Sequence, residues 1–170
     1  MAALSDYLES GLLNHVFRGG SFPKPTGVAI ALTTSAPKDS NTGQGVLYGG
    51  TFPELSSGID YDGAPTLGAQ SSGTNYSRVL LGDPSVVGDT VWSHVSDDLD
   101  AGSGIIRNSG QIVFNTALTD WGWVSGVAIL DSHELGTGNL LMHATLENPR
   151  LIYTGDNVKF DVATLEISFK

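Results

Sequence analysis

The stretch TDWGWVSGVAILD, residues 119–131, decides the fold because it joins two tryptophans to an unbroken run of small and apolar residues. Successive side chains of a strand point to opposite faces of its sheet. A strand that begins near Trp123 therefore places Trp123, Val127 and Ile129 on one face and the small or apolar even-numbered residues on the other. Because both faces are apolar, we predict a central strand that is covered on both sides, with Trp123 in the core. Trp121, at the preceding turn, is expected to be more open.

The C-terminal half contains further short apolar runs at intervals of roughly 8–12 residues, which is typical of a sandwich or barrel. In the last run, Leu165, Ile167 and Phe169 alternate with polar residues, so these three side chains share a core-facing side. The sequence therefore predicts a mainly β protein, an antiparallel β-sandwich of jelly-roll type. Its expected core includes these three residues together with Trp123, Val127 and Ile129.

Near the N-terminus, apolar residues recur at spacings of three and four, which predicts one amphipathic helix over residues 5–17. Ser5 or Asp6 can cap its first turn, and Gly19 and Gly20 can end it. We expect the helix to pack on the sandwich and to supply a contact surface. The candidate interface residues are Leu4, Tyr7, Leu8, Leu12, Val16 and Phe17.

Residues 35–75 are dense in Gly, Ser, Pro and Asp and have no sustained period, so they predict a long irregular insertion. Loops that a rigid scaffold supports often carry recognition. The scattered apolar residues of the insertion are therefore candidates for an interface or a recognition site: Tyr48, Phe52, Ile59 and Tyr61.

The chain of 170 residues most simply forms one domain, residues 1–170, and it carries 18 acidic against 8 basic residues, a net charge of −10. This charge repels nucleic acid and anionic lipid, and no apolar run approaches the ~20 residues that span a bilayer. Cysteine is absent, which excludes disulfides and thiolate metal sites. We therefore expect neither a nucleic-acid partner nor a membrane partner.

No motif for catalysis assembles in the sequence. The segment GWVSG lacks the Gly-x-Ser-x-Gly spacing of a nucleophile elbow, and the four histidines are dispersed without metal-binding spacing. The carboxylates of SDDLDAGSG, namely Asp97, Asp98 and Asp100, resemble the start of a calcium loop, but Asp and Gly are also ordinary turn residues. We predict a protein that is not an enzyme and has no cofactor, with Ca²⁺ at these three residues as the alternative.

Five segments carry a resemblance to a known family: ALSDYLESGLLNHVF, NYSRVLL, IVFNTALTDWGWVSGVAILDS, GNLLMHATL and IYTGDNVKFDVATLEISF. In this order they resemble a family of small virion proteins of tailed bacteriophages, commonly labelled tail fibre proteins. The resemblance covers the helix and nearly all of the C-terminal half. It implies a structural role in the virion and provides no catalytic residues. It departs from the family over residues 45–75, where shorter text is expected.

The resemblance predicts a virion structural protein, assembled in the bacterial host cytoplasm, that contacts other virion proteins of the tail or capsid. Two placements are open: a compact subunit of the tail fibre or baseplate, or a capsid decoration (cement) protein that stabilises the head shell. A receptor- or glycan-binding module is a further alternative. By analogy with other virion parts we expect a homo-oligomer, with a trimer the common choice.

Overall fold

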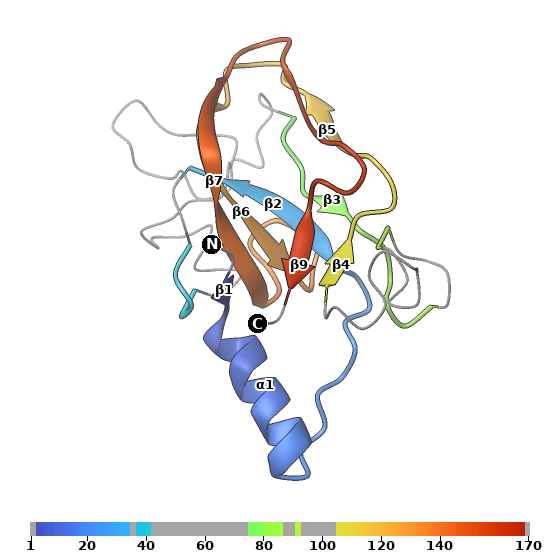
Figure 1. The fold of residues 1–170 in the computed structure, drawn as a ribbon. Coiled ribbons are helices and arrows are strands. Elements are labelled where there is room, and N and C mark those ends of the chain that lie inside the picture. The colour runs from blue at the N-terminus through green and yellow to red at the C-terminus, as the bar shows by residue number, and fades with distance from the viewer. Residues whose placement is uncertain (1–2, 35–36, 42–74, 87–90, 93–104, 169–170) are drawn as a thin grey trace.

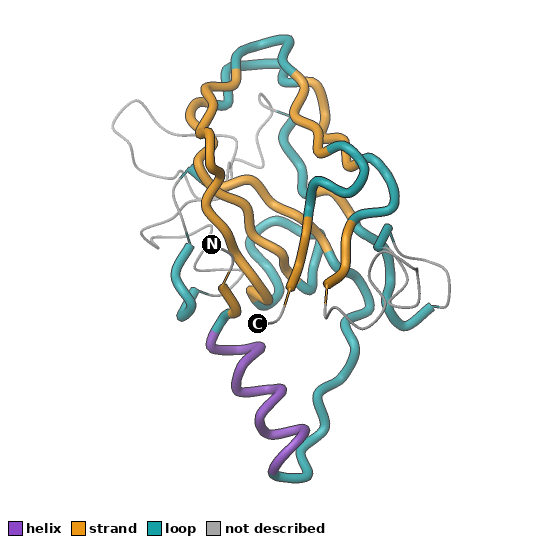
Figure 2. Tube along the Cα trace, viewed as in Figure 1, coloured by secondary structure: helices purple, strands orange, loops and turns teal. Residues whose placement is uncertain are grey.

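A computed structural model describes residues 3–34, 37–41, 75–86, 91–92 and 105–168 of the chain. The protein is mainly β, with antiparallel sheets and one N-terminal helix (Figures 1 and 2), which confirms the predicted fold class. The elements in chain order are β1 (Ala3–Leu4), α1 (Asp6–Phe17), β2 (Ala29–Thr33), β3 (Val79–Leu80), β4 (Ile105–Arg107), β5 (Ile112–Thr116), β6 (Gly122–Leu130), β7 (Leu140–Ile152), β8 (Asn157–Phe160) and β9 (Glu166–Ser168).

The largest sheet has the strand order β1-β7-β6-β2-β3. β6 lies between β7 and β2 and pairs antiparallel with both, so the apolar run that follows Trp121 forms the central strand. Two smaller sheets, β4-β9 and β5-β8, contribute to the same hydrophobic cluster as the large sheet. Their shared core gives a sandwich-like arrangement in which the second layer consists of two separate strand pairs.

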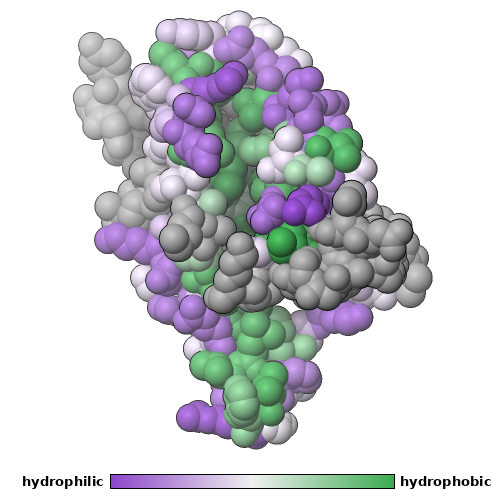
Figure 3. All heavy atoms as spheres, viewed as in Figure 1, coloured by the Kyte–Doolittle hydropathy of each residue, from purple (hydrophilic) through white to green (hydrophobic). Residues whose placement is uncertain are grey.

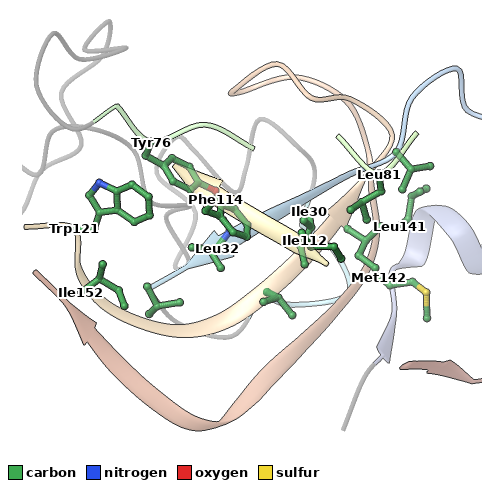
Figure 4. Close-up of a cluster of buried hydrophobic side chains, with 14 of the residues drawn as sticks. Ile30, Leu32, Tyr76, Leu81, Ile112, Phe114, Trp121, Leu141, Met142 and Ile152 are labelled. Atoms are coloured by element: carbon green, nitrogen blue, oxygen red, sulfur yellow. The ribbon is translucent and has the colours of Figure 1, made fainter. Parts of the chain in front are cut away.

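The core fills both faces of the large sheet. On one face, Ile30 and Leu32 of β2 and Val127 and Ile129 of β6 belong to the main cluster, which Figure 4 shows in part. On the other, Ala31 of β2 meets Ala128 in the pairing register and lies in a smaller cluster. β2 and β6 alternate small and large side chains, so the parts of the protein that cover the two faces of the sheet can pack closely on it.

An aromatic group fixes one end of this core. Trp121 packs edge-on against Tyr76 at a ring-centre distance of 5.4 Å, and Tyr76 stacks on Phe114 at 6.2 Å. The Tyr76 hydroxyl also accepts a hydrogen bond from the backbone N–H of Leu32 at 2.9 Å. Figure 4 shows the three rings side by side. They connect β2, β5 and the entry to β6 through contacts between residues far apart in the sequence.

The positions of the two neighbouring tryptophans are the reverse of the prediction. Trp121 is buried, with 5% of its surface exposed, whereas Trp123 is 57% exposed. Strict alternation would place Trp123 on the same face as Val127, but the pairing register with β7 shifts between Val124 and Gly126. An irregularity of this kind changes which side chains face the core. Val124, 2% exposed, takes the core position instead.

β7 is one strand of 13 residues that runs through Asn148 and Pro149, although Asn-Pro is ordinarily a turn signal. The register shift between β6 and β7 lies at this point. Gly126 pairs with Thr145 and Val124 pairs with Arg150, so β7 has more residues than β6 between these two pairs. Proline has no N–H to donate to a ladder and is tolerated where pairing is interrupted. β7 therefore continues through Pro149 by looping outward from β6.

The other predicted core residues differ in burial. Val127, Ile129 and Ile167 are buried. Leu165 is half-buried and packs against the main cluster. Phe169 lies outside the described residues.

The burial of Trp121 and the exposure of Trp123 can be tested directly by replacing each residue. Trp121→Ala should lower the free energy of unfolding by about 3–5 kcal/mol, because it removes a large buried ring and leaves a cavity. Trp123→Ala should change it by less than about 1 kcal/mol, because that ring is largely solvated. Urea unfolding followed by circular dichroism measures both variants. Equal losses for the two would contradict the burial described above.

Candidate functional site

The N-terminal helix is attached to the body only at its base. Ser5 caps α1: its side-chain oxygen accepts a hydrogen bond from the N–H of Leu8 at 3.2 Å. The same hydroxyl donates to the carbonyl oxygen of Leu140, and the backbone N–H of Ser5 donates to Leu141 at 3.0 Å. Asp6 adds a backbone bond to Asp39. These bonds hold the first turn of the helix next to the first residues of β7.

Beyond its base, α1 projects away from the sheets (Figure 1) and has no buried residue. The prediction that the helix packs on the sandwich holds only for its first turn. The cause lies in the pairing of β1 with β7, which makes β1 the edge strand and leads the chain off the sheet at Ser5. Leu4 and Leu8 still pack against the main cluster, but the outer turns meet no sheet.

The outer turns carry exposed apolar side chains. The exposed fractions are 59% for Leu13, 64% for Val16 and 78% for Phe17. Residues at i, i+3 and i+4 are neighbours on a helix surface, so these three form one patch, which we call the apolar tip. Figure 3 shows the lower part of the molecule dominated by apolar residues. Of the predicted helix interface, Val16 and Phe17 lie in the tip, Tyr7 is 40% exposed, and Leu12 is half-buried.

The segment that follows α1 returns along the helix and packs against it. The Phe22 ring packs against Tyr7 with ring centres 5.7 Å apart. A Cβ added at Gly11 would lie 2.2 Å from an atom of the Phe22 ring, so the missing side chain makes room for this contact. The His15 Nδ1 lies 3.1 Å from the carbonyl oxygen of Gly20. Glycine has a low intrinsic helix propensity, and its presence at position 11 is explained by the space that the Phe22 ring needs.

A groove of about 560 Å³ lies between the second half of β7 and β8. Its lining includes Val124, Arg150, Ile152, Lys159 and Asp161. These residues come from β6, β7, β8 and the position after β8, and they converge only through the topology, so the sequence contains no motif that could have identified them. In Figure 1 this region lies at the end of the body opposite to α1.

The charges around the groove are partly paired. The Lys159 Nζ lies 3.5 Å from Asp161, which also accepts a hydrogen bond from the Gln111 amide at 2.6 Å. The hydrogen bond from Gln111 and the adjacent Lys159 charge lower the pKa of Asp161 below its ordinary value, so this carboxylate is ionised at neutral pH. Arg150 takes part in no ion pair within the described part of the chain.

Several predicted site residues lie outside the described residues: the insertion residues Tyr48, Phe52, Ile59 and Tyr61, and the calcium candidates Asp97, Asp98 and Asp100. Both hypotheses therefore stay predictions. Among the residues that the structure does describe, no three His, Asp or Glu side chains gather in a way that could hold a metal ion. In the same part of the chain, no helix has the length and apolar character needed to cross a membrane.

A family model described as podophage GP4 fiber I protein gp80 matches residues 3–52 and 60–168. The chain belongs to this family. It is thus a phage fibre structural protein and a virion component that interacts with other virion proteins. No curated protein matches it. The family match leaves out residues 53–59, which lie inside the segment of residues 45–75 where a departure was expected.

Gly11 provides a test of how the segment after α1 packs on the helix. Gly11→Ala should preserve or increase helix content, because Ala is the better helix former by about 1 kcal/mol. It should nevertheless displace the Phe22 ring and loosen the returning segment, which exposes the bond after Arg18 to trypsin. Ser10→Ala, at an exposed neighbouring position, is the control. Equal cleavage rates in the two variants would contradict the packing of Phe22 on Gly11.

Proposed function

We propose that this fibre protein is a compact, non-enzymatic assembly subunit at the tail fibre or baseplate, and that the apolar tip of α1 attaches it to another virion protein. The observation that carries the proposal is the exposure of Leu13, Val16 and Phe17 on a projecting helix. Contiguous exposed apolar residues on a soluble protein mark interaction sites. The fibre family name is in keeping with a place in the tail fibre, and the capsid decoration role stays the alternative.

The shape of the tip indicates how the partner is built. A narrow projection that presents three large apolar side chains fits an apolar socket or groove, as amphipathic helices do in helix-in-groove recognition. Burial of each such side chain is worth about 1.5–3 kcal/mol. Three together therefore provide a substantial share of the free energy of association. The hydrogen bonds of Ser5 hold the helix in place before binding, which lowers the entropy cost.

We further propose that the exposed face of the β6-β7 pair supports homo-oligomerisation, with a trimer by analogy with other fibres. Trp123 lies opposite Leu151 in the pairing register, and Tyr153 follows two residues later. Trp123 and Tyr153 are 57% and 54% exposed. Aromatic residues are enriched at subunit interfaces, and this face is separate from the apolar tip.

The attachment role is tested by replacing the tip without unfolding the helix. The triple variant Leu13→Gln, Val16→Gln, Phe17→Gln keeps good helix-forming residues and removes the apolar surface. Particles produced with this variant should contain less than about a tenth of the wild-type amount of the protein, measured by quantitative mass spectrometry, because a loss of 1.4 kcal/mol already lowers occupancy of a weak site tenfold.

The control variant Leu118→Gln, Val162→Gln replaces exposed apolar residues outside α1 and should be incorporated normally. Circular dichroism of the isolated proteins checks that both variants are folded. Retention of the triple variant at full occupancy would overturn the attachment role of the tip.

A further inference from the structure

The groove between β7 and β8 has the form of a small-ligand site. β7 and β8 are consecutive strands, but β8 pairs with β5 and not with β7, so the two diverge from the turn that joins them. The resulting volume of about 560 Å³ is within the range of about 300–1,000 Å³ that is common for ligand pockets. In Figure 3 a hollow with apolar residues at its bottom lies between hydrophilic residues on either side, in this part of the molecule.

The bottom of the groove is apolar and held in place by the core. Val124 and Ile152 line it and are 2% and 6% exposed. Phe160 also lines it, and its ring packs edge-on against Phe114 with ring centres 6.4 Å apart. Because these side chains belong to the main cluster or pack against it, the floor is preformed. It offers a surface for the C–H face of a bound ring.

The rim carries groups of both signs. Arg150 presents a guanidinium with five N–H donors and no ion-pair partner among the described residues, which suits a planar carboxylate bound through two hydrogen bonds. Asp156 and Asp161 add carboxylate acceptors, and Asn148 adds an amide. Asp156 uses one oxygen for the backbone N–H of Tyr153 at 2.9 Å, and Asp161 is shared with Gln111 and Lys159.

We propose that this groove binds an acidic sugar of the hexuronic acid class. The sugar carboxylate pairs with Arg150, the ring hydroxyls donate to Asp156 and Asp161, and the ring lies on the apolar floor. The mixture of charges selects this ligand. A hexuronate offers one carboxylate for Arg150 and several hydroxyl donors for the two aspartates. A phosphate lacks a ring of hydroxyl donors, and a neutral sugar would leave the Arg150 guanidinium without a counter-charge.

This site goes beyond the proposed attachment role and does not depend on it. The second half of β7 and the turn that follows it lie at the end of the body opposite α1 (Figure 1), so attachment through the apolar tip does not cover the groove that they line. Binding is tested on the isolated full-length chain, without particles. The failure of one proposal therefore leaves the other intact.

The experiment titrates the isotope-labelled protein with digalacturonate, with a neutral galactose disaccharide and with inorganic phosphate, and follows the backbone amide signals by NMR. Digalacturonate should shift the signals of residues 148, 150–152 and 157–161, and the other two probes should bind at least about tenfold more weakly. Arg150→Gln should weaken digalacturonate binding about tenfold or more, because it removes a bidentate charge-assisted pair. Arg150→Lys, which keeps the charge without the fork, should give an intermediate loss.

Arg18→Gln, a change of the same kind at an exposed arginine of the projection, should leave binding unchanged. The proposal is overturned if digalacturonate produces no shifts at millimolar concentration, if the neutral disaccharide or phosphate binds as tightly, or if Arg150→Gln binds like the wild type. The spectrum of each free variant shows whether its fold is preserved.

Discussion

The burial of β6 on both faces is the constraint on which the other elements depend. Its backbone pairs with β7 on one side and β2 on the other, and its side chains from Gly126 to Leu130 are buried without exception. A strand of this kind needs an apolar layer above and below it. The two small sheets supply one layer, and their aromatic contacts with the entry to β6 fix its register. This centre supports β7, the neighbouring strand, which lies next to both the proposed attachment helix and the groove.

β7 is the element that connects the fold to function. Its N-terminal part receives the hydrogen bonds of Ser5 and so orients α1, while its C-terminal part loops away from β6 and forms one wall of the groove. One long strand therefore carries the proposed attachment point at one end and the proposed sugar site at the other. The same register shift that opens the groove moves Val124 into the core and turns Trp123 outward.

The sequence predicts the features that depend on local pattern. The alternation of Leu165 and Ile167 and the spacing of Leu8 and Leu12 identify a strand and a helix, because hydrophobic periodicity follows local geometry. Trp123 was misplaced because a bulge has no reliable signal in a single sequence, and one extra residue reverses the faces that follow. The groove could not be predicted, because Arg150 and Lys159 converge only through the outward path of β7. The exposure of Leu13 likewise depends on where the helix leaves the sheet.

An electron cryomicroscopy map of the particle tests the central claim, that the protein attaches through one end and leaves the other accessible. The account predicts that the tip of α1, around Val16 and Phe17, is buried against another virion protein, while the β7-β8 groove faces solvent. A map in which the helix is solvent-exposed and the groove end forms the contact with the particle would contradict it.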